Sequence, residues 1–313
     1  MKENLDAIDR HILYELDWDA RQSETDLAKK IGRSREAVRY RIRNLENNKI
    51  IDGYILWINF GKLGYRIYNT YLKTRKELPD WLKRKDLAWL ALTNGGWGMG
   101  FGILAKTSRG FFETKNRLFS DFGQIFQKTS GEAIDMHIYS KTFLYPSPKE
   151  RRLLMGSAEE TAIDGTDRKI ISELYKNSRI KLVELAKSLG ISPDIARIRM
   201  KKLERKGVIV GYKALLNYKK LGIEFYRSFL YFDSFSKEDE KKLHEIAMRE
   251  PGIVYVSTSI SPWDVEVDIA AEDPEEFNRI LQKLKEKLPN LRNLETVLLY
   301  DNYMFPAKNM SEL

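Results

Sequence analysis

The sequence repeats itself at an interval of 158 residues, which is 167 minus 9 when Asp9 is placed on Asp167. The segment SETDLAKKIGRSREAVRYRIRNLEN, residues 23–47, returns as KLVELAKSLGISPDIARIRMKKLER, residues 181–205. The same offset also matches Arg10 with Arg168, Leu16 with Leu174, Arg21 with Arg179, Gly32 with Gly190, Ser34 with Ser192, and Gly53-Tyr54 with Gly211-Tyr212. Chance does not produce so many identities without a gap. The 313 residues therefore form two homologous units of roughly 150 residues each.

The repeated segment predicts short helices with recognisable ends. Asp6 is placed to cap a first helix, whose apolar positions recur at helical spacing. Ser23 is placed to cap a second helix, and Gly32 supplies the turn that ends it. Ser34 then caps a third helix, after which residues 51–60 read as a strand. This order predicts a helix-turn-helix followed by a wing or hinge strand.

The outward face of the third helix gathers cations and an aromatic residue. Arginine side chains on such a face can bind guanine bidentately in the major groove and hold backbone phosphates. The alternative is an ordinary solvated charged face. We predict that the caps and outward positions of both copies contact DNA: Ser34, Arg35, Glu36, Arg39, Tyr40 and Arg43 in the first, and Ser192, Pro193, Asp194, Arg197, Ile198 and Lys201 in the second. The first face carries more cations than the second.

These segments resemble the Lrp/AsnC family of feast/famine transcription regulators. The resemblance rests on LDAIDRHILYEL, DLAKKIG, SREAVRYRIRNLE and KIIDGY in the first half, and on DRKIISELYKNSRIKLVELAKSLGISPDIARIRMKKLERKGVIVGY in the second, which is closer to the family pattern. The resemblance implies a βαββαβ ligand-sensing domain after each helix-turn-helix. It also implies that sensing domains pair sheet against sheet, and that effectors such as amino acids bind between subunits.

Apolar periodicity agrees with that expectation in both halves. It predicts strands at 68–74, 87–93, 99–106 and 133–139, with helices at 78–84 and 111–122. In the second half it predicts strands at 225–232, 253–259, 264–270 and 295–300, with helices at 237–248 and 274–288. We expect an α+β fold with two winged helix-turn-helix domains, each followed by a ferredoxin-like βαββαβ sensing domain. The expected divisions are 1–60, 61–146, a linker at 147–162, 163–218 and 219–313.

Two loops are candidates for an effector site. Residues 94–100, NGGWGMG, are glycine-rich, but no Lys-Ser/Thr pair follows, so a hairpin explains them better than a phosphate-binding loop. Trp97 matches Trp263 at an offset of 166, which is 263 minus 97. The loop at 259–264 resembles the family's glycine-and-aspartate loop, which implies that Asp264 receives a ligand ammonium group. The family's glycine is absent there and Gly98 stands at the aspartate position, so Asp264 is equally well read as a turn or salt-bridge residue. The candidate effector residues are Trp97, Gly98, Trp263 and Asp264.

Composition narrows the remaining classes of function. Fifty-four Lys and Arg against 45 Asp and Glu give a net charge of +9, which favours polyanionic partners such as double-stranded DNA. Cysteine is absent, and His11, His137 and His244 are far apart in sequence, so we predict no metal site, no cofactor and no catalytic group. No apolar run is long enough for a signal peptide or a membrane span, so we expect a cytoplasmic protein. Arg151 and Arg152 read as solvated linker charges, with phosphate contact as the alternative.

The functional hypothesis is a sequence-specific, DNA-binding transcriptional regulator that is not an enzyme. Its two sensing domains would pair within one chain as a covalent pseudo-dimer, which can associate further. Unlike third helices would favour unlike half-sites, and a small effector such as an amino acid would regulate binding. The alternatives are an architectural DNA-binding protein with weak sequence preference and an enzyme like the siroheme decarboxylases, which share the family's architecture.

Overall fold

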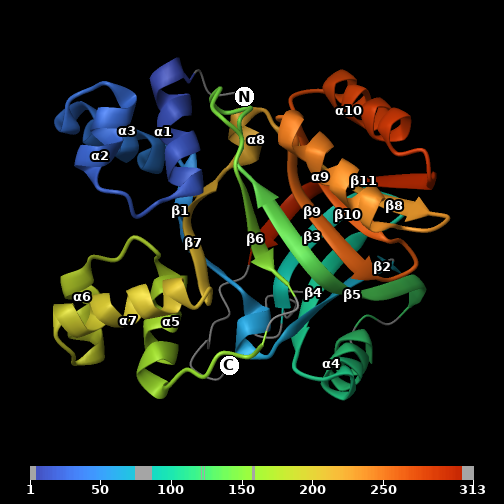
Figure 1. Ribbon diagram of the computed structural model, residues 1–313, viewed down its shortest axis with the longest axis horizontal. Helices are drawn as coiled ribbons and strands as arrows, with labels where there is room; N and C mark the ends of the chain where they lie inside the picture. Colours follow the sequence, from blue (N-terminus) through green and yellow to red (C-terminus); the bar gives the residue numbers. More distant parts are fainter. Residues whose placement is uncertain (1–4, 75–86, 121, 123, 157–158, 305–313) are drawn as a thin grey trace.

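The computed structural model describes residues 5–74, 87–120, 122, 124–156 and 159–304, with side chains up to residue 300 (Figure 1). The first half contains α1 (Ala7–Trp18), α2 (Glu24–Ile31), α3 (Arg35–Asn47), β1 (Ile51–Ile58), the 3-10 turn η1 (Phe60–Leu63), β2 (Arg66–Thr74), β3 (Leu87–Gly95), β4 (Met99–Ala105), α4 (Ser108–Ser120), β5 (Ile125–Tyr139) and β6 (Arg151–Met155). The second contains α5 (Gly165–Lys176), α6 (Leu182–Leu189), α7 (Pro193–Arg205), β7 (Ile209–Leu216), α8 (Tyr218–Leu221), β8 (Glu224–Phe232), α9 (Lys237–Arg249), β9 (Ile253–Ile260), β10 (Val265–Ala271), α10 (Pro274–Lys287) and β11 (Leu291–Met304).

Each half begins with a winged helix-turn-helix, and the caps of the first half are those that the sequence predicts; in the second half Ser192 caps α7, whereas Lys181 precedes α6 without a side-chain cap. The side chains of Asp6, Ser23 and Ser34 accept hydrogen bonds from the first-turn backbone N–H groups of α1, α2 and α3. Gly32 ends α2 with a φ of 68°, a left-handed conformation that suits glycine. Gly190 ends α6 in the same way with a φ of 65°. These local signals set the lengths of the helices before any tertiary contact is considered.

The wing strands of the two halves pair with each other. β1 and β7 form a two-stranded antiparallel ribbon in which Tyr54 lies opposite Ala214 and Leu56 lies opposite Tyr212. Two backbone hydrogen bonds at equivalent positions also join the halves. The N–H of Ala20 donates to the carbonyl of Tyr212 at 2.9 Å, and the N–H of Ser178 donates to the carbonyl of Tyr54 at 3.0 Å. The two halves therefore meet through the same residues of the repeat, related by the 158-residue offset.

Arginines complete this exchange. The guanidinium of Arg21 lies over the ring of Tyr212 at 5.3 Å, and that of Arg179 lies over Tyr54 at 4.9 Å. Each arginine belongs to one helix-turn-helix, and the tyrosine belongs to the wing strand of the other half. Each helical unit is thus anchored to the wing strand of the opposite half.

The strands that follow the wings join into one sheet. Its order is β2-β4-β3-β11-β8-β10-β9-β5-β6, and β2 also pairs with β5, so eight strands close on themselves. Within each half the order is ferredoxin-like, β5-β2-β4-β3 and β11-β8-β10-β9. The halves connect twice in the same way, through β3 with β11 and β9 with β5, all antiparallel. Closure leaves neither half with an unpaired edge at these strands.

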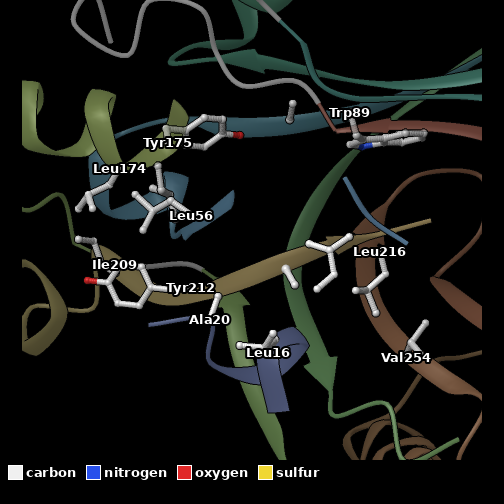
Figure 2. Packing of buried hydrophobic residues seen from close by; sticks show 14 of the residues in the cluster. Leu16, Ala20, Leu56, Trp89, Leu174, Tyr175, Ile209, Tyr212, Leu216 and Val254 are labelled. Atoms are coloured by element: carbon white, nitrogen blue, oxygen red, sulfur yellow. The ribbon is translucent and has the colours of Figure 1, made fainter. Parts of the chain in front are cut away.

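Helices cover the outer face of this closed sheet. α4 packs its Leu118 against strands of the first half, and α9 and α10 pack Leu243 and Ile280 against strands of the second (Figure 1). A larger core runs through the ribbon and the inner face of the sheet. Figure 2 shows Leu16 and Ala20 from the first helical unit and Leu174 from α5 in this core, around the two wing strands. The helical units and the sheet thus share one hydrophobic core.

The predicted strands and helices of both sensing domains are present wherever the structure describes them. The expected helix at 78–84 lies outside the described residues. The predicted linker, 147–162, contains β6, which pairs with β5, so part of this segment is integrated into the sheet. The reading of Arg152 as a solvated charge is wrong: its guanidinium lies over the ring of Trp18 at 4.1 Å and donates to the Trp18 carbonyl. Lys149 donates to the carbonyl of Glu250, which ends α9, and to that of Ile253, which begins β9.

A buried charge cluster joins α1 to the ribbon and the sheet. The carboxylate of Asp17 accepts two hydrogen bonds from Lys141 Nζ, at 2.6 and 2.8 Å, and Lys213 Nζ lies 3.4 Å from it. All three residues are buried. Burial opposes ionisation of Asp17, but the two ammonium groups outweigh it and hold the pKa of the carboxyl below its ordinary value. The cluster has no equivalent in the second half, where Tyr175 occupies the position of Asp17.

Candidate nucleic-acid interface

The outward face of α3 presents the residues that the sequence predicts, with one of them held by a partner. Arg35, Tyr40 and Arg43 are exposed, and Tyr40 is 67% accessible although it is aromatic. Arg39 is half-buried, and its Nε and Nη2 donate to one carboxylate oxygen of Glu24 on α2, at 2.9 and 2.6 Å. Glu36 is exposed beside Arg35. The face therefore offers a tyrosine, Arg43 and Arg35, which lies 3.5 Å from the carboxylate of the exposed Glu36, while Arg39 is oriented by α2.

The outward face of α7 has a different character. Ser192 caps the helix, Pro193 occupies its first turn, and Arg197 forms an ion pair with Asp194. Lys201 is exposed. Two apolar residues project into solvent: Ile198, which is 62% accessible, and Ile195, which is 46% accessible. Ile195 was not among the predicted contacts, although its position three residues before Ile198 places both on one helix face. This second face carries more exposed apolar side chains and fewer cations than the first.

An equivalent ion-pair brace positions both third helices. Arg41 Nη1 donates to Asp6 and Asp9 of α1, both at 2.8 Å. In the second half Arg199 Nη1 donates to Asp164 and Asp167 of α5, at 2.7 and 2.8 Å. No role was assigned to Arg41 from the sequence alone. The signal that could have identified the brace is the common 158-residue offset of all three charges.

The two helical units lie on the same side of the closed sheet, one on each side of the β1–β7 ribbon (Figure 1). Their third helices thus belong to one end of the molecule, and the sensing domains lie at the other. Such an arrangement can present two helices to one long ligand, as a dimeric helix-turn-helix protein does with two half-sites.

The candidate effector loops converge on one side chain inside the sheet. Trp97, in the β3–β4 hairpin, and Trp263, in the β9–β10 hairpin, lie 6.2 and 5.4 Å from the ring of Tyr71. Both tryptophans are buried, and Trp263 Nε1 donates to Glu266 at 3.1 Å. The carboxylate of Asp264 accepts from the backbone N–H of Phe232 at 2.8 Å, and Gly98 donates its N–H to the carbonyl of Leu72. These contacts give each residue a structural role.

Beside them lies a polar group that sequence reasoning missed. Arg227 donates to both carboxylate oxygens of Asp268, at 2.6 and 2.7 Å, and to Tyr71 Oη. Glu266 accepts from Asn69, Tyr71 and Trp263, and burial raises its pKa. The offset of 166 places Glu266 and Asp268 on Gly100 and Gly102, so the charges occur in the second half only. The replacement of two glycines by two carboxylates in the aligned strand was the sequence signal that could have identified this group.

Two of the three histidines lie close together in space, although they are far apart in sequence. The rings of His137 on β5 and His244 on α9 are 4.4 Å apart, because β5 pairs with β9 of the other half and α9 covers that strand. Burial lowers the pKa of His244 to about 4. Within the part of the chain that the structure describes, no group of three or more His, Asp or Glu side chains is placed to hold a metal ion. No described helix is long and apolar enough to cross a membrane.

Comparisons with known proteins match the helix-turn-helix segment at the start of each half. Residues 5–46 match the AsnC-type helix-turn-helix domain, and residues 163–210 match a winged helix-turn-helix DNA-binding family. An uncharacterised HTH-type transcriptional regulator of Pyrococcus furiosus is 32% identical over 126 residues, which cover 40% of this chain and 84% of that protein. The leucine-responsive regulatory protein of Haemophilus influenzae is 44% identical over 63 residues, 20% of this chain and 38% of that protein.

A solved structure matches the chain along its whole length. The siroheme decarboxylase NirDL superposes with a TM-score of 0.62 and covers 98% of this chain and 97% of its own, at 11% sequence identity. A second structure of that enzyme, in complex with an iron-uroporphyrin III analogue, gives a TM-score of 0.61. At this identity the likeness establishes the fold of the tandem arrangement and nothing about its chemistry.

Proposed function

The chain belongs to the Lrp/AsnC family of helix-turn-helix transcriptional regulators, and on that premise we propose that it binds specific DNA sequences as a covalent pseudo-dimer. The observation that carries this proposal is the pair of exposed third-helix faces on the same side of the closed sheet. In separate-chain family members two subunits would supply two such helices. Here the two halves of one chain supply them, joined by the β1–β7 ribbon and by the strand pairs β3–β11 and β5–β9. A shift of promoter DNA by the purified chain, in titrations at fixed salt, tests the proposal.

We expect the preferred DNA site to consist of two unlike half-sites. The first face offers Arg35 and Arg43, which suit guanine and phosphate, and the second offers Ile195 and Ile198, which suit apolar contact. Because the two helices are covalently fixed in one molecule, the protein imposes no palindrome on its site. Selection from a random DNA library measures this directly, and half-sites about one or two helical turns apart are expected. Recovery of a perfect palindrome would contradict the cis arrangement.

We expect the second half-site to be read through thymine methyl groups. Exposed aliphatic side chains contact the C5-methyl group of thymine in the major groove, and uracil lacks that methyl. Replacing thymine by uracil in the second half-site should weaken binding about fourfold per contacted methyl, which corresponds to about 0.8 kcal/mol. Ile198→Ala should weaken binding to the thymine site and remove the difference between the two DNAs. Anisotropy titrations at one salt concentration provide the measurement. If Ile198→Ala prefers thymine over uracil as strongly as the wild-type chain does, Ile198 does not contact the thymine methyl group.

An amino-acid effector at the hairpin loops stays a prediction. Its residues, Trp97, Gly98, Trp263 and Asp264, are adjacent to a shared core, and each already makes an internal contact. An amino acid that binds there would have to compete with the Phe232 N–H for the carboxylate of Asp264. Calorimetric titration with the twenty amino acids would identify such an effector. A DNA-binding role also keeps the cytoplasm as the predicted location.

An enzyme is the second candidate, because NirDL resembles this chain over its whole length. Relatives named as transcriptional regulators favour the regulator over a tetrapyrrole enzyme. A purified protein with a haem-like absorbance and no DNA shift would reverse that preference, while weak sequence preference with steep salt dependence would support an architectural DNA-binding protein.

A further inference from the structure

A cavity of about 140 Å³ lies where the β1–β7 ribbon faces the closed sheet. One wall comes from the ribbon, with Trp57 on β1 and Lys213 on β7. The opposite wall comes from the sheet, with Trp89 on β3, Tyr255 on β9 and Ser257 on β9. None of the four hairpin-loop residues discussed as an effector site lines it. The cavity therefore has its own lining residues, at the junction between the helical units and the sensing domains, and Glu266 in its wall connects it to Trp263 through a hydrogen bond.

The charges around the cavity are balanced among themselves. Three cationic groups (Lys141, Lys213 and Arg227) and three carboxyl groups (Asp17, Glu266 and Asp268) lie in or directly behind its walls. Arg227 is bound to both oxygens of Asp268, and its guanidinium lies 4.5 Å from the Trp89 ring. The groups satisfy one another, so a charged ligand would find no uncompensated counter-charge. An uncharged ligand fits this environment better.

One polar atom in the cavity wall has no partner. The hydroxyl of Ser257 is buried, with the residue 5% accessible, and it has no hydrogen-bond partner among the described residues. Its neighbours across the sheet, Met136 and Glu266, also line the cavity. A buried hydroxyl without a partner is unfavourable unless something bound supplies the hydrogen bond. Ser257 therefore supplies an oriented polar group within a mostly aromatic and aliphatic wall.

From these features we infer that the cavity is a binding site for a small, uncharged, single-ring molecule that carries one hydroxyl or carbonyl group. The size supports one ring, since an apolar cavity of about 150 Å³ in another protein binds benzene. The aromatic walls supply the contact area, and the Ser257 hydroxyl supplies the hydrogen bond. Binding here does not depend on the proposed function.

A consequence for regulation does rest on the proposed function. Lys213 Nζ contacts Tyr255 Oη at 3.2 Å in the cavity wall and lies 3.4 Å from Asp17 of α1. The occupied cavity would hold the ribbon against the sheet, and the Lys213–Asp17 contact connects that ribbon to the first helical unit. Occupancy of the cavity should therefore change DNA affinity through α1–α3 more than through α5–α7. The reason is that α5 has Tyr175 at the position of Asp17 and so has no carboxylate there to pair with the ribbon.

The test uses the full chain and phenol as the probe, with benzene as the matched molecule that lacks the hydroxyl. Calorimetry in the absence of DNA should give saturable binding of one phenol per chain. Ser257→Ala should weaken phenol about 3- to 10-fold and leave benzene unchanged, because only the hydrogen bond is lost. Ser257→Leu should block both molecules by filling the cavity. Ser228→Ala is the matched control, since Ser228 is also buried with an unpartnered hydroxyl but does not line the cavity.

Absence of saturable phenol binding at millimolar concentration would overturn the proposed site. Equal phenol affinity in the wild-type chain and Ser257→Ala would overturn the role of the hydroxyl, even if Ser257→Leu folded poorly. Phenol binding with unchanged DNA affinity would overturn the regulatory consequence while supporting the site. If the chain binds phenol but shifts no DNA, the proposed function fails and the binding site is supported.

Discussion

Replacing Arg35 and Arg43 together by alanine is expected to reduce DNA affinity about 10- to 100-fold. Both side chains are exposed on α3, where Arg35 lies 3.5 Å from the exposed Glu36, whereas Arg39 is hydrogen-bonded to Glu24 and is less available. Removing two cations that neutralise phosphates should also lower the slope of log affinity against log salt by about 2. Arg197→Ala should have a smaller effect, because Arg197 already pairs with Asp194 and the second face carries fewer cations. Titrations over a series of salt concentrations measure both quantities.

A charge-matched control separates local contact from the general loss of positive charge. Lys285→Ala with Lys287→Ala removes the same two charges from the last turn of α10, which packs on the outer face of the closed sheet and not in a helix-turn-helix (Figure 1). Affinity and salt slope should stay close to wild type. Equal losses in the two double variants would mean that α3 is not a reading helix and that net charge alone drives binding.

Asp17→Ala is expected to reduce the free energy of unfolding by about 3–5 kcal/mol, since it leaves the buried ammonium groups of Lys141 and Lys213 without their carboxylate. All three residues are buried between α1, the ribbon and the sheet, so the two ammonium groups would be left in a poorly solvated environment. Urea unfolding followed by circular dichroism measures the change. Adding Lys141→Met to Asp17→Ala should recover part of the loss, because one of the two unpaired charges is then removed.

An exposed ion pair provides the comparison. Glu173 and Lys176 lie 2.6 Å apart on the surface of α5, and Glu173→Ala should change the free energy of unfolding by less than about 0.5 kcal/mol. A loss below about 1 kcal/mol for Asp17→Ala would indicate that water or local rearrangement compensates the buried lysines.

Local features of the fold were predictable from the sequence. The caps at Asp6, Ser23 and Ser34 depend on hydrogen bonds within three residues, and the left-handed turn at Gly32 depends on one residue. The strands and helices of the sensing domains follow from apolar periodicity, which also depends on near neighbours. The 158-residue repeat then predicted that both halves share these elements, although Lys181 replaces the capping Ser23 in the second half.

The features that could not be predicted depend on how the halves meet. The contact between His137 and His244 exists only because β5 pairs with β9, and the Asp17 cluster gathers residues from three distant segments. The charged segment that contains β6 has the composition of a linker, yet the Arg152 guanidinium lies over the ring of Trp18. Of the proposed interface, the exposed face of α3 was predictable, whereas the attachment of Arg39 to Glu24 was not, since it depends on the packing of two helices.

The closed sheet has a consequence for how this protein is made. The first half is complete at β5, but two of its edge strands, β3 and β5, receive their partners from β11 and β9. During synthesis those edges leave the ribosome well before the strands that cover them, and β11 is the last described strand to be made. Exposed edges invite pairing with other chains. A second nascent chain on the same messenger is then the nearest competitor, and the order of synthesis makes domain-swapped dimers the expected misfolded product.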